Sequence, residues 1–380
     1  MKIVVAPDSF KGSLTSREVI DIVTHSARDY FADVTIVAVP IADGGDGTVE
    51  ALVSATDGRI IKAQARDPLG RVRDCVYGEA NGAAVIGMSE ASGLALLAQA
   101  ERNPLETSSH GTGDLIRHAL DGGYTELLIG IGGSATNDGG TGALQALGMR
   151  FFYRADGSEI VRMCGKELLH VARADVSGLD ARLKNAKITV MCDVTNPLTG
   201  EFGATYVYGP QKGGTPEQLD ALEAGMVSFG RLMNVHTGHD IAAMPGAGAA
   251  GGIGAALHAF AGAELARGID AVLSLVRFDE LIQDADLVIT GEGRVDAQSA
   301  FGKVIHGVAT RAKAANVPVV VIAGGVGEGA EAVYELGVSA IVPLPDAPIP
   351  LDDCIRDAAE LMSKAADRAF ALMRIGHGIQ

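Results

Sequence analysis

The chain has 380 residues, of which 47% are hydrophobic and 21% are charged, a balance typical of folded globular proteins. This length predicts two or three domains of about 150 residues each and excludes a peptide hormone or an isolated zinc module, while the composition excludes a mainly disordered or collagen-like chain. Glycine is unusually frequent, with 50 residues, and predicts many tight turns and close approaches of backbone segments.

The charge is strongly negative, because 31 Lys and Arg residues face 47 Asp and Glu residues and the net charge is −16. We therefore expect neither nucleic acid nor a membrane surface as a partner. A small anion can still bind where backbone N–H groups, a divalent cation or a few basic side chains reverse the sign locally. Four scattered cysteines and an N-terminus without a signal-like apolar run predict a cytoplasmic location.

Short β-branched runs recur along the chain, and each is followed by a loop of Gly, Asp or Ser and then by an amphipathic helical pattern. This alternation predicts a mostly parallel sheet covered on both faces. Thr15 and Glu18 form a capping-box pattern at the start of a first helix, and an apolar stripe predicts one last helix over residues 352–373. The expected strands are residues 3–6, 34–39, 127–130, 188–191, 287–290, 319–323 and 340–342.

Residues 59–79 show a different pattern, because polar and apolar residues partly alternate on either side of a turn at residues 67–70. This pattern predicts an antiparallel pair of strands. We expect a discontinuous Rossmann-like or flavodoxin-like parallel-sheet domain formed by residues 1–60 and 266–380. A second α/β domain, residues 61–265, is then inserted into the first. The βα unit at residues 111–147 can belong to either domain.

Two glycine-rich loops offer backbone N–H groups to a nucleotide. One follows the strand at 127–130 and the other contains a G-x-G-x-x-G string, but neither has the strand and helix that a dinucleotide site requires. Tight-turn packing explains either loop equally well, and no P-loop string occurs. The expected nucleotide-binding residues are Gly132, Gly133, Ser134, Thr136, Asn137, Gly246, Gly248 and Gly251.

Three polar loops follow predicted strands and should meet at one edge of the sheet, because the carboxyl ends of parallel strands lie together. They supply oxygen ligands suited to Mg²⁺, a carboxylate that can accept a hydroxyl proton, and cations for an anionic substrate. A turn or cap role explains any single Asp equally well. The residues concerned are Asp8, Ser9 and Lys11 in the first loop, Asp43 and Asp46 in the second, and Glu292, Arg294 and Asp296 in the third.

Two further candidates lie in the predicted insert. Asp193 follows the strand at 188–191, and Lys212 stands among glycines, where its ammonium can reach a phosphate. A solvated turn explains Lys212 as well as phosphate binding does.

These motifs together resemble the bacterial type I glycerate kinase family, in order and spacing, from residue 3 to about residue 325. Val295 and Ser299 stand where Leu and Thr are expected, and neither change alters charge. The resemblance implies ATP-dependent phosphorylation of D-glycerate with Mg²⁺, usually at the 2-hydroxyl, and a two-domain α/β fold with the site between the domains. The segments that carry it are residues 6–13, 42–48, 130–140, 196–200, 209–213, 245–252 and 290–296.

For this chemistry we expect Asp43 and Asp46 to hold Mg²⁺ and either Asp193 or Asp296 to accept the proton of glycerate. Lys11, Lys212 and Arg294 would neutralise phosphate or carboxylate, and the guanidinium fork of Arg294 suits the carboxylate best.

Asp8, Ser9 and Glu292 complete the expected substrate site, and the glycine loops surround ATP. A non-catalytic nucleotide or phosphate sensor and a nicotinamide-dependent oxidoreductase are the alternatives. The phosphorylated hydroxyl, the loop that holds adenine and the oligomeric state, a homo-oligomer included, stay open.

Overall fold

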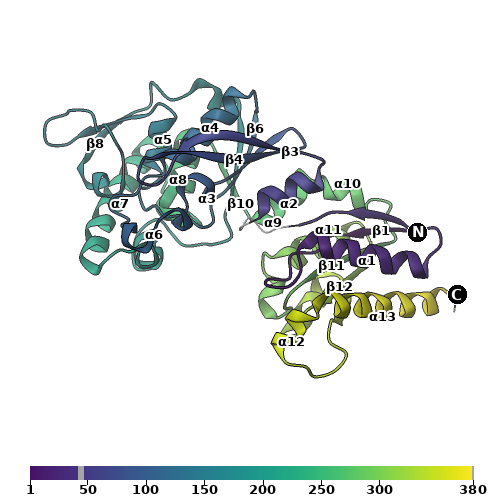
Figure 1. Cartoon of the computed structure of the whole chain (residues 1–380). Helices are drawn as coiled ribbons and strands as arrows, with labels where there is room; N and C mark the ends of the chain where they lie inside the picture. Colours follow the sequence, from purple (N-terminus) through teal and green to yellow (C-terminus); the bar gives the residue numbers. More distant parts are fainter. Residues whose placement is uncertain (42–46, 379–380) are drawn as a thin grey trace. The chain divides into compact units, whose positions relative to one another are not determined.

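The computed structural model describes residues 1–41 and 47–378 and divides into two compact units (Figure 1). Unit 1 comprises Met1–Asp43, Ser54–Asp57 and Ile269–Gln380, and unit 2 comprises Gly44–Val53 and Gly58–Gly268. The predicted architecture, a discontinuous parallel-sheet domain with a second α/β domain inserted into it, is confirmed.

Unit 1 contains a five-stranded parallel sheet with the order β13-β12-β11-β1-β2. In the register of the central strands, Val4 lies opposite Val288 on one side and Val37 on the other. Each of these strands overlaps one expected from the sequence, because continuous β-branched runs suit strands buried on both faces. The strands are β1 (Lys2–Val5), β2 (Thr35–Ala38), β11 (Leu287–Glu292), β12 (Val319–Ala323) and β13 (Val338–Pro343).

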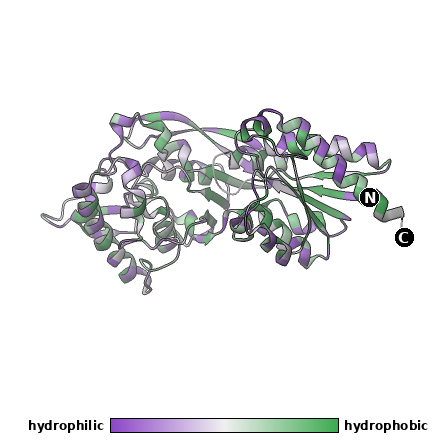
Figure 2. Ribbon diagram, turned by 90° about the horizontal axis from the view of Figure 1, so that it is seen from below, coloured by the Kyte–Doolittle hydropathy of each residue, from purple (hydrophilic) through white to green (hydrophobic). Residues whose placement is uncertain are grey.

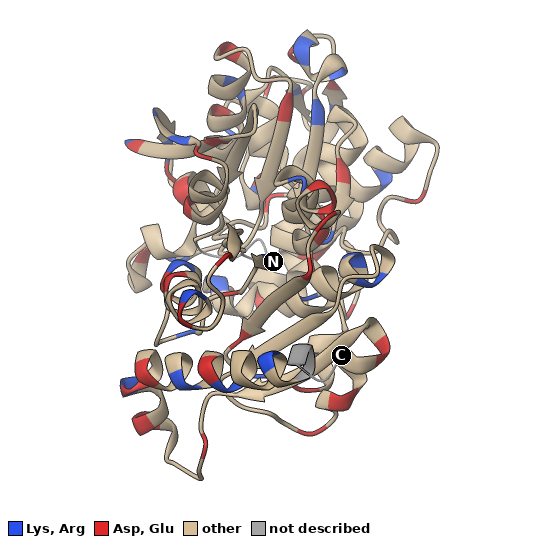
Figure 3. Cartoon of the chain, turned by 90° about the vertical axis from the view of Figure 1, so that its right-hand side faces the viewer, with Lys and Arg blue, Asp and Glu red and all other residues tan. Residues whose placement is uncertain are grey.

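Helices cover this sheet and turn their apolar residues toward it (Figure 2). α1 (Ser16–Tyr30) and α13 (Ala358–Gly378) pack together over the strands, and the predicted capping box at Thr15 and Glu18 is present. Charges of both signs run along α13 (Figure 3), including an ion pair of 2.7 Å between Lys364 and Glu360. The other helices are α9 (Gly268–Leu275), α10 (Phe278–Ile282), α11 (Val304–Ala314) and α12 (Leu351–Arg356).

The single helix expected over residues 352–373 is wrong, because the chain breaks at Asp357 into α12 and α13. Asp357 is the C-cap of α12, and its N–H makes the last hydrogen bond of that helix, to the carbonyl of Asp353 at 2.9 Å. The apolar stripe is divided as a result, so that Met362 and Phe370 are buried while Ile355 is partly exposed.

Unit 2 contains a mixed six-stranded sheet with the order β10-β9-β6-β5-β4-β3. The predicted antiparallel pair forms one edge, and the other four strands are parallel. A separate antiparallel pair is formed by β7 (Arg150–Tyr153) and β8 (Val171–Asp175). The strands of the main sheet are β3 (Arg59–Arg66), β4 (Val72–Ala80), β5 (Ala83–Gly87), β6 (Glu126–Gly130), β9 (Lys187–Met191) and β10 (Glu264–Ala266).

The βα unit that sequence reasoning left open belongs to unit 2. Among the helices in the described ranges, none has the length and apolar character needed to cross a bilayer. The remaining α-helices are α2 (Thr48–Ala55), which contributes to both units, α3 (Ser89–Ser92), α4 (His110–Asp121), α5 (Thr141–Ala146), α6 (Ala204–Tyr208), α7 (Pro216–Thr237) and α8 (Ile253–Ala261).

Candidate active site

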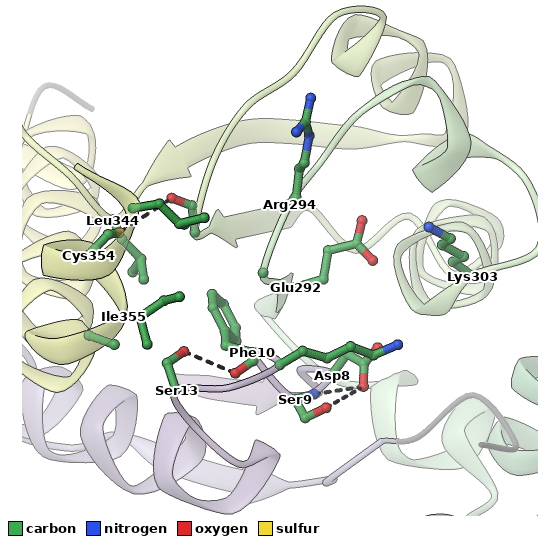
Figure 4. A pocket seen from close by; sticks show the side chains of 15 residues that line it. Asp8, Ser9, Phe10, Ser13, Glu292, Arg294, Lys303, Leu344, Cys354 and Ile355 are labelled. Atoms are coloured by element: carbon green, nitrogen blue, oxygen red, sulfur yellow. Dashed lines mark hydrogen bonds between the residues drawn. The ribbon is translucent and has the colours of Figure 1, made fainter. Parts of the chain in front are cut away.

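A pocket of about 380 Å³ lies within unit 1 at the carboxyl ends of its strands (Figure 4). From β1 the strand order runs outward to β2 on one side and from β11 to β13 on the other, so the order reverses between β1 and β11. Open α/β sheets bind ligands in the crevice at such a switch point. The pocket is lined by Asp8, Ser9, Phe10, Lys11, Ser13, Glu292, Gly293, Arg294, Lys303, Gly324, Leu344, Leu351, Cys354, Ile355 and Ala358.

The loop after β1 is held in place by backbone hydrogen bonds. The N–H of Asp8 donates to the carbonyl of Gly291 on the neighbouring strand at 2.9 Å, and the Asp8 carboxylate accepts from the Ser9 N–H at 2.7 Å. The N–H of Phe10 donates to the carbonyl of Leu14 at 2.7 Å, which closes a tight turn. The Phe10 ring is consequently buried, while Lys11 lies exposed at the tip of the turn.

The loops after β11 and β12 run side by side and fix the position of Glu292. The Gly324 N–H donates to the carbonyl of Glu292 at 3.1 Å, and the Val295 N–H donates to the carbonyl of Gly325 at 2.9 Å. A Cβ added at Gly324 would lie 2.3 Å from the carbonyl oxygen of Gly293, so only glycine permits this approach.

Glu292, the last residue of β11, carries the buried carboxylate of this pocket and is 6% exposed. Burial raises its pKa to about 7, because the charged form loses hydration; a hydrogen bond from Ser299 and the charge of Lys303 oppose this rise. The negative charges of Asp8 and Asp296 add to it. Near neutral pH, Glu292 can therefore both accept and release a proton.

Three cationic side chains line the same pocket, and they differ in setting. Lys303 precedes α11 and acts electrostatically on Glu292, whereas Lys11 is exposed. Arg294 has a side chain 71% exposed, with its Nε 3.5 Å from the Asp296 Oδ2. Figure 4 shows the Arg294 side chain directed away from Glu292 and Lys303. The pocket thus offers positive charge to an anionic ligand despite the acidic chain.

The two aspartates expected to accept the proton both cap turns or helices. Asp296 Oδ1 accepts from the Gln298 N–H at 2.9 Å at the start of the 3₁₀ turn Ala297–Ala300, and Asp296 is not among the residues that line the pocket. In unit 2, Asp193 Oδ1 accepts from the Gly268 N–H at 2.9 Å where α9 begins. Asp296 and Asp193 therefore each have a capping role, which is the alternative that the sequence left open for single aspartates.

Asp43 and Asp46, the expected Mg²⁺ ligands, lie outside the described residues. Within residues 1–41 and 47–378, no group of three or more His, Cys, Asp and Glu side chains is arranged to hold a metal ion. Mg²⁺ beside a nucleotide commonly uses one or two carboxylates, with phosphate oxygens and water as the other ligands. Asp8 in the unit 1 pocket fits that pattern.

The two glycine-rich loops of unit 2 lie directly against each other. The Gly139 N–H donates to the carbonyl of Gly251 at 2.9 Å, and a Cβ added at Gly251 would lie 2.2 Å from the carbonyl oxygen of Thr136. Ser134, Thr136 and Asn137 are buried in this packing. Gly246 and Gly248 belong to the same turn, in which the Gly248 N–H donates to the carbonyl of Asn196 at 3.0 Å.

Lys212 is buried in unit 2, which rules out a solvated turn, the alternative to phosphate binding at this position. Its side chain is 1% exposed, and its Nζ donates to the carbonyl oxygen of Thr136 at 2.6 Å. Burial lowers its pKa to about 7, and the charge of Asp138 opposes that shift. Thr136 Oγ1 and Asn137 Oδ1 are buried nearby without a hydrogen-bond partner among the described residues.

Asp138, which sequence reasoning did not select, is the acidic group beside Lys212. Burial raises its pKa, although its carboxylate accepts hydrogen bonds from the N–H and hydroxyl of Ser109, both at 2.8 Å, and from the Gly142 N–H at 3.1 Å. The opposite shifts of Asp138 and Lys212 share one cause, which is the loss of water around both charges.

A second pocket, of about 330 Å³, lies within unit 2 at the carboxyl ends of β5, β6 and β9. It includes the predicted residue Gly132, the nearby Gly130, and two acidic side chains, Glu50 and Glu90. No Lys or Arg is among its described lining residues, so these side chains alone do not favour an anion. Gly133 lies beside it and its carbonyl accepts from the Leu94 N–H at 2.8 Å.

Several residues of the unit 1 pocket were missed by sequence reasoning. Lys303 could have been found, because it stands directly before a helix that follows a polar loop after a strand. Leu344, Leu351 and Ile355 carried no such signal, since apolar residues at helical spacing usually belong to a core. The fold nevertheless brings them to the same cavity as Asp8, Ser9, Lys11, Glu292 and Arg294.

A parallel α/β unit with carboxylates and cations gathered at its switch point defines a protein that binds small charged ligands. The chain matches the sequence model of the glycerate kinase family over residues 3–374 and belongs to that family. This confirms the resemblance found in its motifs.

Curated relatives are similar to this chain over nearly the full length of both sequences. Glycerate kinase of Bacillus subtilis (strain 168) is 48% identical over 377 residues, which are 99% of this chain and 98% of the relative. Glycerate 2-kinase of Escherichia coli (strain K12) is 44% identical and is covered to 99%, as is this chain. A crystal structure described as glycerate kinase 2 from Salmonella typhimurium LT2 has a TM-score of 0.88 and 44% identity, with all of both chains covered.

Proposed function

We propose that this protein is an ATP-dependent glycerate kinase that transfers the γ-phosphoryl group to the 2-hydroxyl of D-glycerate. The observation that carries the proposal is the unit 1 pocket, in which buried Glu292 lies with Lys303 at the switch point of the sheet. Similarity to the Escherichia coli protein named glycerate 2-kinase supports the choice of hydroxyl.

Phosphoryl transfer requires alignment of the two substrates, neutralisation of phosphate charge and a group that receives the hydroxyl proton. Lys11 and Lys303 supply positive charge at the pocket, and Arg294 suits the carboxylate of glycerate through its guanidinium fork. We assign proton acceptance to Glu292 in preference to Asp296 and Asp193, because its pKa of about 7 matches a base that works near neutral pH.

Magnesium belongs to the proposal because kinase chemistry depends on it. Asp8 would hold the ion from the pocket, together with Asp43 and Asp46 from the acidic loop, which leaves the carboxylate of Glu292 to accept the proton. Neutralisation of the β- and γ-phosphate oxygens is the chemistry that the bound ion supplies.

Membership in the glycerate kinase family argues against both alternatives, a non-catalytic nucleotide sensor and a nicotinamide-dependent oxidoreductase. We also place the enzyme in the cytoplasm, because its four cysteines are free thiols, the form that a reducing compartment maintains.

The proposal is tested by incubating the protein with MgATP and D-glycerate and coupling the product to enolase, pyruvate kinase and lactate dehydrogenase without a mutase. We expect a signal, because enolase uses 2-phosphoglycerate directly. A signal that appears only after phosphoglycerate mutase is added would show transfer to the 3-hydroxyl. No signal in either assay contradicts the kinase function. The need for Mg²⁺ is tested by separating ADP from ATP by chromatography after reactions with and without excess EDTA, because the coupling enzymes themselves require Mg²⁺.

A further inference from the structure

The unit 1 pocket has two chemically different ends. One end carries the charged groups Asp8, Glu292 and Lys303. The other is apolar: Figure 4 shows Leu344 and the partly exposed Ile355 on that side. Leu351 of α12, which is 73% exposed, also lines the pocket. The apolar end is formed by Phe10, Leu344, Leu351, Cys354, Ile355 and Ala358.

An apolar surface of this kind binds some parts of the two substrates better than others. Every carbon of glycerate carries oxygen, and the triphosphate is highly charged, so neither gains by leaving water for such a surface. The purine base has two wide faces of low polarity that gain from contact with aliphatic and aromatic side chains. Adenine is therefore the only large apolar group that the proposed reaction brings to the protein.

We propose that the apolar end of the unit 1 pocket binds the adenine base of ATP, and that the triphosphate extends toward Lys303 and Glu292. This inference rests on the proposed kinase function and deepens it. It places the base against α12 and the Phe10 ring, not in the glycine-rich loops of unit 2.

The packing of unit 2 supports this choice. Thr136 and Asn137 are fully buried, and the ammonium of Lys212 is engaged by the carbonyl of Thr136. These groups present no surface to a base or phosphate where they stand. The neighbouring pocket beside Gly132 has Glu50 and Glu90 but no Lys or Arg among its described lining residues. Lys11, Arg294 and Lys303 line the unit 1 pocket instead, and their charge favours a triphosphate there.

The first test truncates the apolar end with Leu351→Ala and Ile355→Ala. Each variant should raise the KM for ATP roughly fivefold or more, because apolar contact with the base is lost, while the KM for D-glycerate stays within about twofold. Leu372→Ala is the matched control, since Leu372 is a leucine 68% exposed on α13 that does not line the pocket. It should leave both constants unchanged.

Inorganic tripolyphosphate separates the base from the phosphates. Its inhibition constant against ATP should be the same in the wild-type protein and in Leu351→Ala, because it has no base. An unchanged KM for ATP in both pocket variants, or a rise in the KM for D-glycerate instead, overturns the inference while the kinase function stands.

A thiol footprint tests the same site without turnover. Cys354 lines the pocket and Cys192 lies in unit 2; both are partly exposed, whereas Cys75 and Cys164 are buried. Burial raises the pKa of the Cys354 and Cys192 thiols, so alkylation by N-ethylmaleimide is best followed by mass spectrometry at about pH 8.5.

MgATP should slow the labelling of Cys354 and leave Cys192 unaffected, and D-glycerate alone should protect neither thiol. Protection by D-glycerate alone, or no protection of Cys354 by MgATP, contradicts the assignment. If the wild-type protein has no kinase activity yet MgATP protects Cys354, the proposed function fails and the base site survives.

Discussion

The carboxylate of Glu292 accepts a hydrogen bond from the hydroxyl of Ser299, and both side chains are buried at the end of β11. The bond favours the ionised carboxylate, whereas burial favours the protonated one. The balance between these effects leaves Glu292 poised to titrate near neutral pH, in a pocket that also holds Lys303 and Asp8. The hydrogen bond therefore makes the pKa of Glu292 depend on Ser299, a residue that does not line the pocket.

Glu292→Gln should lower kcat by ~10²-fold or more, because the amide cannot accept the proton of the substrate hydroxyl. Binding of MgATP, measured by calorimetry, should be weakened much less than turnover. Glu280→Gln, at an exposed position on α10, is the control and should keep normal activity.

Asp296→Asn distinguishes the two carboxylates of the same loop. Asn preserves the capping of the turn at 297–300, so turnover should stay close to normal if Glu292 is the base. A ~10²-fold loss in Asp296→Asn with little loss in Glu292→Gln would transfer the role to Asp296.

Ser299 variants should shift the pH dependence of turnover. Removal of the hydroxyl in Ser299→Ala takes away a hydrogen bond to the ionised form, so the pKa of Glu292 should rise above about 7. The acid limb of the kcat profile, where activity falls because the base is protonated, should move to higher pH. Ser299→Thr keeps a hydroxyl and should restore the wild-type profile; identical profiles for all three proteins would contradict the pairing.

Much of the fold could be predicted from the sequence because its strands are continuous β-branched runs between polar loops. The helix break at Asp357 could not, since no Gly or Pro marks it and the apolar spacing continues from Ile355 to Ala358. The sequence therefore predicts that Ile355 belongs to the core, whereas in the structure it lines the pocket.

The convergence of Asp8, Lys11 and Glu292 could be predicted from the sequence, because each lies in a polar segment that follows or ends a predicted parallel strand. The sequence does not indicate which of Glu292 and Asp296 accepts the proton, because both are acidic and lie close together after the same strand. Burial distinguishes them, and burial depends on the folded structure. Lys212 shows the same limit: its glycine neighbours suit a phosphate loop or a turn, and only packing places its ammonium against Thr136.

Lys212→Met should change how the stability of the protein depends on pH. The pKa of Lys212 is lowered to about 7 in the folded state, so the unfolded chain binds more protons between about pH 7 and its ordinary value of 10.5. The wild-type protein should therefore gain about 2 kcal/mol from this group between about pH 7 and 9. Urea unfolding of both proteins across this range measures the difference.

Lys212→Met should lack this gain, and Lys184→Met, an exposed control, should retain it. Parallel pH dependence in the wild-type protein and Lys212→Met would show that the ammonium is not kept from water as the structure has it.

Gly324→Ala should disturb the site because the new Cβ would lie 2.3 Å from the Gly293 carbonyl oxygen, forcing apart the loops that hold Glu292. We expect a loss of about 1–3 kcal/mol in stability, typical of overpacking, and a fall in kcat because Glu292 shifts. Gly325→Ala is the matched control, since a Cβ there meets nothing within 4 Å. Thermal unfolding and the coupled kinase assay on both variants measure the two effects, and equal behaviour of the neighbouring glycines would contradict the close approach at Gly324.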